Sequence, residues 1–169
     1  MCKTYVALFA LIIWLPGYSQ SSTDIEEDKS RVADMSEQYL KNISTENYDA
    51  AYLKLGDGVK PRPLEDSWIK KKKSFNIIAG ELESINITEV IVYDNPSFAK
   101  IPGIYIFVHF RNEFKDLPVH CGFLAWLKQA DSSDDYQIIG DESGSIPKIM
   151  YLELTKEKRI ELEAEIGCK

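Results

Sequence analysis

Four runs of β-branched and aromatic residues follow one another late in this 169-residue chain, and they constrain its fold more than any other feature. The runs cover residues 85–93, 104–111, 119–127 and 136–139. Turn-forming residues separate them, and apolar side chains recur at every second position from Ile104 to Phe110, as in a strand with one buried face. This pattern predicts a meander of at least four antiparallel strands.

Three amphipathic segments precede the strands. Apolar residues recur at helical spacing over residues 24–43, again from Tyr48 to Leu55, and along a stripe that joins Trp68 to Ile78. Gly80 is placed to end the third segment. Helices this short cannot bury their apolar faces alone, so we expect all three to pack on the sheet.

A last helix is expected to begin at Thr155 and to end at Gly167. The predicted fold class is therefore α+β, with three N-terminal helices on a curved antiparallel sheet of at least four strands, plus a C-terminal helix. Residues 20–169 are expected to form a single domain, with a core at about 24–145 and a helical extension at about 148–169. A chain of this length buries enough surface to fold without structural metals.

The order and spacing of several segments resemble a known fold. The segments are Asn47–Tyr52, Trp68 followed by Phe75 and Gly80–Leu82, and Tyr93–Pro96 leading to Pro102–Tyr105. Together they resemble the nuclear-transport-factor-two-like fold of the cystatin-like α+β group, and more narrowly small exported bacterial families of unknown function with that fold. The resemblance implies a cone whose concave sheet face, closed by the helices, often forms a pocket. It implies no particular activity.

Residues 1–19 are typical of a cleaved signal peptide. Lys3 precedes an apolar run from Tyr5 to Leu15, and Gly17 and Ser19 are the small residues that a signal peptidase accepts. The run is shorter than the roughly 20 residues that a membrane span needs, so we favour cleavage near Ser19 over a membrane anchor. The mature protein is expected in the periplasm or outside the cell, with no transmembrane segment.

Two cysteines remain after this cleavage, Cys121 in the third run and Cys168 near the C-terminus. An oxidising compartment permits a disulfide between them, which would tie the last helix to a central strand. The alternative is a buried free Cys121 and a frayed tail that carries Cys168. We favour the disulfide.

The charge is acidic but unevenly distributed. With 27 Asp and Glu against 20 Lys and Arg, the net charge of −7 argues against general nucleic-acid binding. Four consecutive cations nevertheless form a patch: Lys70, Lys71, Lys72 and Lys73. Because four residues span a helical turn, one of them must lean toward the stripe of Trp68 and Phe75. A solvated helix end is the simpler interpretation, and a weak contact with an anionic partner or membrane surface is the alternative.

The candidate ligand pocket combines aromatic rings with an imidazole, a cation and a carboxylate, which suits a small anion or an aromatic acid. Its residues are Tyr105, Phe107, His109, Arg111, Glu89 and Trp126. Glu89 shares a predicted strand face with Ile87 and Ile91. It either lines the pocket, where it could act as a general base, or faces solvent, which we favour.

The two histidines, His109 and His120, lie on adjacent predicted strands. They could share a metal ion if the register placed them opposite each other and Glu113 or Asp116 supplied a third ligand. A slip of one residue breaks that pairing. We therefore favour two ordinary strand histidines and expect no metal or other cofactor.

The chain contains no nucleophile or phosphate-loop motif. We expect an exported, non-enzymatic module that binds a small molecule or a protein of unknown identity. One alternative is a small pocket enzyme with general acid/base chemistry, as in the isomerases and dehydratases of the fold that the chain resembles. The other is an immunity protein whose acidic surface neutralises a toxin.

Overall fold

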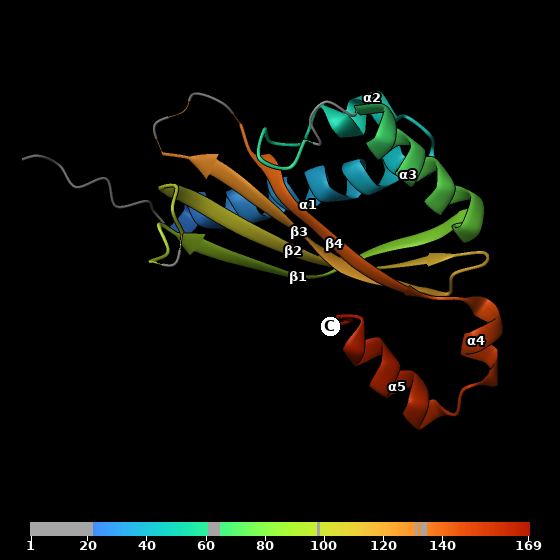
Figure 1. Ribbon diagram of the computed structural model, residues 1–169. Helices are drawn as coiled ribbons and strands as arrows, with labels where there is room; N and C mark the ends of the chain where they lie inside the picture. The colour runs from blue at the N-terminus through green and yellow to red at the C-terminus, as the bar shows by residue number, and fades with distance from the viewer. Residues whose placement is uncertain (1–21, 61–64, 98, 131, 133–134) are drawn as a thin grey trace, which may run out of the picture.

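The computed structural model of the chain describes residues 22–60, 65–97, 99–130, 132 and 135–169. The predicted signal peptide, residues 1–19, lies outside this part of the chain. The described residues form an α+β fold built on one antiparallel sheet, which confirms the predicted fold class (Figure 1).

The sheet is a meander in which the strands follow chain order, so that each pairs with the next. The strands are β1 (Leu82–Asp94), β2 (Gly103–Phe114), β3 (Val119–Gln129) and β4 (Gln137–Ile146). The prediction of four strands is confirmed. The largest difference is in β4, which continues seven residues beyond its predicted end at Ile139 through a polar stretch with no apolar alternation.

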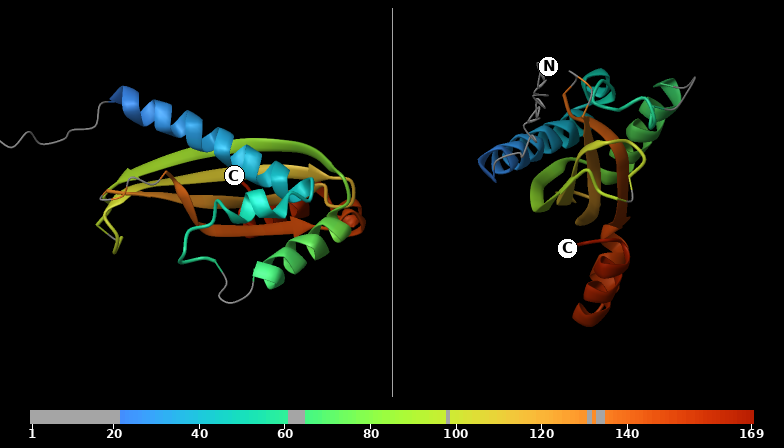
Figure 2. Two further views of the ribbon diagram at one scale, coloured as in Figure 1. Left: turned by 90° about the horizontal axis from the view of Figure 1, so that it is seen from above. Right: turned by 90° about the vertical axis from the view of Figure 1, so that its left-hand side faces the viewer.

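Three helices precede the sheet and two follow it. They are α1 (Ser22–Ser44), α2 (Tyr48–Tyr52), α3 (Glu65–Ala79), α4 (Lys148–Glu153) and α5 (Lys156–Glu165). The first three lie on one face of the sheet, the α1 face, and the last two lie on the other, the α5 face (Figure 1). Seen from above, α1 crosses the sheet and α3 lies beside the edge formed by β4 (Figure 2).

The helix ends follow from local chemistry. Gly80 ends α3 in the left-handed conformation, with φ of 75°, where glycine has no steric cost. Thr155 caps α5 as predicted, because its side chain accepts a hydrogen bond from the Lys158 amide. The short α4, which begins after Pro147, was not predicted.

The main core lies between α1 and the sheet. Ile106 and Val108 on β2 pair with Trp126 and Leu124 on β3, and these four side chains are fully buried against a cluster that includes Val32 of α1. The alternation predicted for residues 104–110 is confirmed. It also fixes which side chains of β2 and β3 face α1 and which face α5.

A smaller core joins α5 to the sheet. Val119, Cys121 and Ile146 are buried there beneath Leu162 and Ile166. A Cβ atom added at Gly144 would lie only 2.7 Å from the Cβ of Ile166. The absence of a side chain at position 144 therefore lets the end of α5 approach β4 closely.

Candidate functional site

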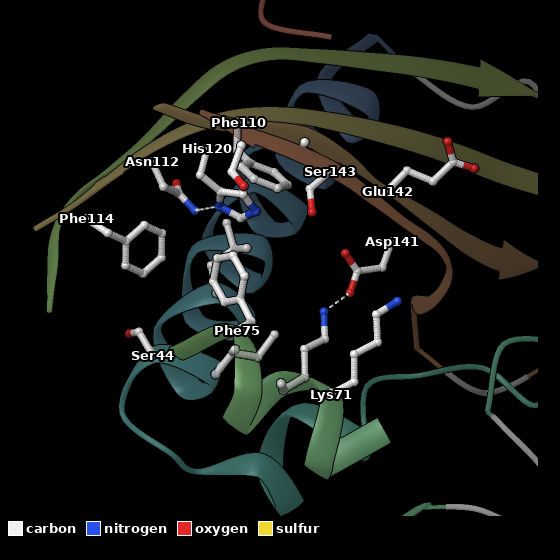
Figure 3. A pocket seen from close by; sticks show the side chains of 15 residues that line it. Ser44, Lys71, Phe75, Phe110, Asn112, Phe114, His120, Asp141, Glu142 and Ser143 are labelled. Carbon is white, nitrogen blue, oxygen red and sulfur yellow. Dashed lines mark hydrogen bonds and ion pairs between the residues drawn. The ribbon is translucent and has the colours of Figure 1, made fainter. Parts of the chain in front are cut away.

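A cavity of about 490 Å³ lies on the α1 face, between α3 and the polar end of β4 (Figure 3). Its apolar wall comes from α1, α3 and β2. The residues of this wall are Leu40, Ile43, Phe75, Phe110 and Phe114. A pocket with mostly apolar walls and a few fixed polar groups is the usual form of a ligand site.

The cavity is open because the end of β4 carries small side chains. Ser143, Gly144 and Ser145 all line it, and none of them is large enough to reach α3. The gap is instead bridged by Lys72, whose Nζ lies 2.7 Å from Oδ2 of Asp141. The polar run that extends β4 beyond its predicted end therefore also creates the cavity.

Asp141 is the anchored acid of the site. Its Oδ2 accepts hydrogen bonds from Lys72 Nζ and from the Tyr39 hydroxyl, each at 2.7 Å. The side chains of Lys72 and Asp141 are both 18% exposed, so the pair is largely shielded from water. Burial, together with the charge and hydrogen bond of Asp141, raises the pKa of Tyr39 and keeps its hydroxyl protonated.

His120 points into the cavity from β3 and lies among three aromatic rings. Its ring centroid is 4.8 Å from that of Phe75, 5.4 Å from Phe110 and 5.6 Å from Phe114. Burial lowers the pKa of His120 to about 4, and the charge of Lys72 acts in the same direction while Asp141 opposes it. The imidazole is therefore neutral near pH 7.

Asn112 lies beside His120. Its Nδ2 is 3.5 Å from His120 Nδ1, at the outer limit of a hydrogen bond, and with Nδ2 as the donor the ring proton sits on Nε2. Asn112 is 1% exposed, and within the described part of the chain its Oδ1 has no hydrogen-bond partner.

Most residues of the predicted pocket lie elsewhere. Tyr105, Phe107, His109 and Arg111 share the α5 face, so they do not line this cavity. Trp126 faces the opposite way, is fully buried in the main core, and donates from Nε1 to Ser36 Oγ at 2.8 Å. The structure therefore separates Trp126 from the other predicted pocket residues.

Glu89 was expected on the same strand face as Ile87, and this expectation is wrong. A register shift between the two residues turns Ile87 toward the main core and Glu89 away from it. Glu89 is exposed and binds Lys169 at 3.1 Å, as the solvent-facing alternative requires. Glu89 therefore lacks the burial that a general base in an apolar pocket would need.

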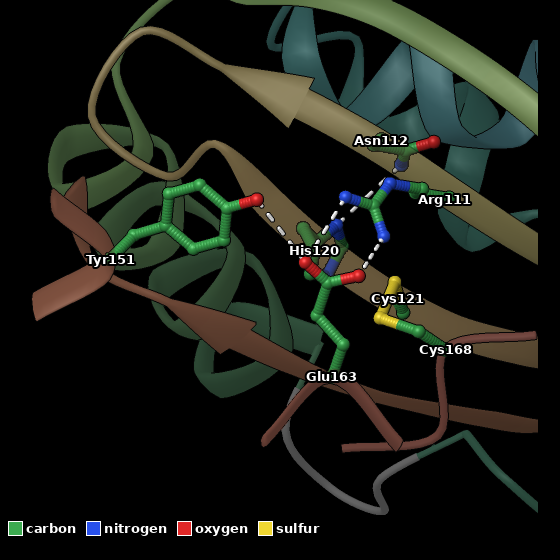
Figure 4. Close-up of a disulfide and its surroundings, with 7 residues drawn as sticks. All are labelled: Arg111, Asn112, His120, Cys121, Tyr151, Glu163 and Cys168. Atoms are coloured by element: carbon green, nitrogen blue, oxygen red, sulfur yellow. Dashed lines mark hydrogen bonds and ion pairs between the residues drawn. A yellow bond between two sulfur atoms is a disulfide. The ribbon is translucent and has the colours of Figure 1, made fainter. Parts of the chain in front are cut away.

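The predicted disulfide between Cys121 and Cys168 is present and secures α5 (Figure 4). Beside it, Arg111 donates to both carboxylate oxygens of Glu163, at 2.6 and 3.4 Å. The Tyr151 hydroxyl donates to the same carboxylate at 3.3 Å. Arg111 is thus committed to α5 and is not left to bind a ligand.

The four lysines of the patch have different surroundings. Lys72 leans over Trp68, 5.6 Å from its ring centroid, as predicted for one of the four. Lys73 lies 5.7 Å from the Tyr48 ring centroid. Lys71 lines the cavity, and no ion-pair partner of Lys71 is found among the residues that the structure describes.

The register places Asn112 opposite His120 and Phe123 opposite His109, so the two histidines project from opposite faces of the sheet. The pairing that a shared metal would need is not formed. Across the described ranges, no group of three His, Cys, Asp or Glu residues is arranged to hold a metal ion. None of the helices within these ranges is long and apolar enough to span a membrane.

A second depression, of about 680 Å³, lies near the start of α1 and is more open. Two of its charged groups, Arg31 and Asp28, bind each other and further partners. Arg31 binds Asp28 at 3.1 Å and Asp135 at 2.7 Å, and the Tyr136 hydroxyl donates to Asp28 at 2.9 Å. The cavity beside α3 is therefore the better candidate site.

Sequence reasoning named His120 and the lysines separately but did not bring them together with Asp141. The signal that could have done so is the small, polar run from Asp141 to Ser145, which leaves an edge strand without cover. Compared with known protein families, with curated proteins and with solved structures, the chain matches none.

Proposed function

We propose that this chain is a non-catalytic binding module whose ligand places an apolar group in the cavity beside α3 and an anionic group next to Lys71. The observation that carries the proposal is the cavity itself, an open space of about 490 Å³ with aromatic walls and fixed polar groups. Such a site can recognise a ligand by shape and by a few hydrogen bonds.

The charges around the cavity favour an anion. Lys72 is neutralised by Asp141 at 2.7 Å, whereas Lys71 is exposed and lines the same cavity. Glu142 also lines the cavity, but it pairs with Phe123 on the α5 face, and its carboxylate projects away from His120 and Phe75 in Figure 3. The unneutralised charge inside the site is therefore positive.

The same geometry argues for binding rather than catalysis. A histidine with a pKa of about 4 is not protonated to imidazolium near neutral pH, so it is no general acid there, and it is a weak base. Asp141 is held by Lys72 and Tyr39, which fixes it as a structural anion. The small pocket enzyme remains the second candidate, and the immunity protein has no separate observation in its favour.

We further infer that the protein is exported to the periplasm or beyond. The disulfide between Cys121 and Cys168 supports this, because such bonds persist in oxidising compartments. The order of three helices before a four-stranded meander supports the proposed kinship with exported families of the nuclear-transport-factor-two-like fold.

A matched pair of fluorescent probes tests the binding proposal. Both 1-anilinonaphthalene-8-sulfonate and its uncharged analogue N-phenyl-1-naphthylamine are titrated into residues 20–169 with the disulfide intact. We expect saturable binding of both and tighter binding of the sulfonate. Lys71→Gln should remove most of the difference between the probes, because it removes the free cation.

Two variants make this experiment specific. Lys70→Gln removes an exposed charge on the same helix outside the cavity lining and should change neither titration. Ser145→Trp should fill the cavity and weaken both probes. Unchanged titrations for both Lys71→Gln and Ser145→Trp would show that the probes bind elsewhere and would refute the proposal.

A further inference from the structure

The outer edge of β4 is open beside the cavity. β4 is the last strand of the sheet, and the described residues pair with its outer edge at one point, where Ile138 binds the segment after α2. Gly56 N donates to Ile138 O, and Ile138 N donates to Lys54 O, each at 2.8 Å. From Asp141 onward, no backbone partner on this edge is found within the described ranges.

The geometry of the strand identifies which backbone groups are free. In a strand, residues whose side chains share a face also direct their N–H and C=O groups to the same side. Ile138 faces α1 and hydrogen-bonds outward. Asp141, Ser143 and Ser145 also face α1, because they pair with Leu124, Gly122 and His120. Their backbone groups therefore point outward, and none of the described residues hydrogen-bonds to them.

The open edge is unlike a protected one. Natural sheets shield their edges with bulges, prolines, lysines or covering segments. The opposite edge strand, β1, has two register shifts of this kind. β4 has one such shift, between Ile138 and Gly140, but its register with β3 is regular from Asp141 to Ile146, and this stretch has neither a proline nor a lysine.

The edge and the cavity form one continuous surface. Ser143 and Ser145 line the cavity and present their backbones to the edge, and the Ser143 side chain points into the cavity (Figure 3). A strand added here would direct every second side chain to the same face as Ser143, toward His120 and Phe75. Residues two positions before and after this one share its face and would pass close to Lys71 on α3.

We propose that the ligand of this site is an extended, acidic segment of a partner protein, which adds to β4 as a fifth strand between Asp141 and Ser145. An apolar side chain of the segment fills the cavity, and a carboxylate binds Lys71. This rests on the proposed binding function and names its ligand class. Main-chain hydrogen bonds give such a complex affinity, and the cavity gives it specificity.

Charge decides against a second copy of this chain as the occupant. A β4-to-β4 contact would bring Lys71, the lining cation that Asp141 does not pair, from both copies toward one groove, where like charges repel. An acidic segment would instead bring carboxylates to Lys71, where opposite charges attract. The proposal therefore commits to a different polypeptide.

The first experiment uses an array of ten-residue synthetic peptides against residues 20–169 with the disulfide intact. Each peptide has alternating Val and Thr, one central Phe or Leu, and Asp or Glu two positions before and two positions after it, on the same face of the strand; counterparts carry Lys at these two positions. We expect acidic peptides to bind and to displace 1-anilinonaphthalene-8-sulfonate. The best peptide is then N-methylated one residue at a time. Methylation should weaken binding at every second residue, since only alternate amides face β4.

Ser143→Pro tests the protein side of the same hydrogen bonds. The Ser143 amide points outward, so proline removes a donor to the peptide and no bond within the sheet. We expect a loss of affinity of about fivefold to tenfold, with Ser143→Ala, which keeps the amide, close to wild type. Thermal unfolding verifies that both variants fold, and the N-methylated peptides give the answer independently if Ser143→Pro does not.

Each outcome has one meaning. Alternate sensitivity to N-methylation, with competition against the sulfonate probe, supports the proposal. Binding of the probe that no peptide displaces would refute the fifth strand and leave the proposed function standing. If neither probe nor peptide binds, both proposals fail. A dimer that Ser143→Pro dissociates would identify a second copy as the occupant and overturn the acidic partner.

Discussion

The indole of Trp126 is buried under α1, and a single side chain satisfies its polar atom. Nε1 donates to Ser36 Oγ at 2.8 Å, and this hydroxyl in turn donates to the Val32 carbonyl at 2.8 Å. Ser36 and Trp126 are both 0% exposed, so water has no access to either group. A buried donor without its acceptor retains the full cost of desolvation.

Ser36→Ala is therefore expected to lower the free energy of unfolding by about 1–3 kcal/mol. Urea unfolding measures the change. Ser74→Ala on α3 is the matched control, because Ser74 makes the same kind of hydrogen bond to the carbonyl four residues earlier but is exposed. In a Trp126→Phe background, which has no indole N–H, the cost of Ser36→Ala should shrink. An equal cost in both backgrounds would contradict this account.

At the residue scale, the faces of individual side chains were the least predictable feature. The apolar alternation of β2 was read correctly from Ile104 to Phe110, because no bulge interrupts that strand. Glu89 shares a face with Ile91 as predicted but not with Ile87, because the register shift after Ile87 inserts one residue and reverses the alternation. The residue types around Ile87 do not reveal that such a register shift occurs there.

At the scale of elements, the α4–α5 segment is held to the sheet by three different kinds of contact. The Cys121–Cys168 disulfide is covalent, Arg111 and Glu163 form a two-bond ion pair, and Leu162 and Ile166 pack on Val119 and Ile146. The disulfide closes a loop with a sequence separation of 47, which stabilises the folded state by roughly 4 kcal/mol in the loop-entropy model.

Replacing both cysteines with alanine should therefore loosen α5 before it affects the sheet. We expect faster trypsin cleavage at Lys156, Lys158 and Arg159, which mass spectrometry measures. The far-ultraviolet circular dichroism of the sheet should persist. Cleavage at Lys70 to Lys73 on α3 is the internal control and should not change. Equal cleavage rates in α5 with and without the disulfide would show that the ion pair and the apolar contacts suffice to hold it.

The elements themselves were largely predictable, with one informative exception. Thr155 and Gly167 bracket α5 as expected, since capping chemistry is local. The end of β4 was missed because Asp141 to Ser145 has no apolar alternation. An edge strand needs only backbone pairing with its neighbour, here β3. The segment that sequence patterns could not assign is thus the one that builds the candidate site.

At the scale of the whole molecule, the two faces of one sheet have different roles. The α5 face carries the disulfide and the Arg111–Glu163 pair, and the α1 face carries the main core and the cavity. Each face also holds one histidine whose pKa is lowered. Burial is the main cause for both His120 and His109, and for His109 the charge of Lys169 adds to it while Glu89 opposes it.

These histidines make the folded protein sensitive to mild acid. The pKa of His120 falls from 6.5 in an open chain to about 4 in the fold, so the unfolded chain binds more protons between these values. Stability should therefore fall as the pH drops from about 6.5 to about 4, by about 1.4 kcal/mol per pH unit and roughly 3 kcal/mol in all from His120. Urea unfolding at half-unit pH intervals measures this slope.

His120→Gln, which can still accept a hydrogen bond from Asn112, should flatten the slope between pH 6.5 and about 4. His109→Gln should leave the His120 contribution in place. Parallel curves for the wild type and His120→Gln would show that carboxylates alone produce the acid sensitivity.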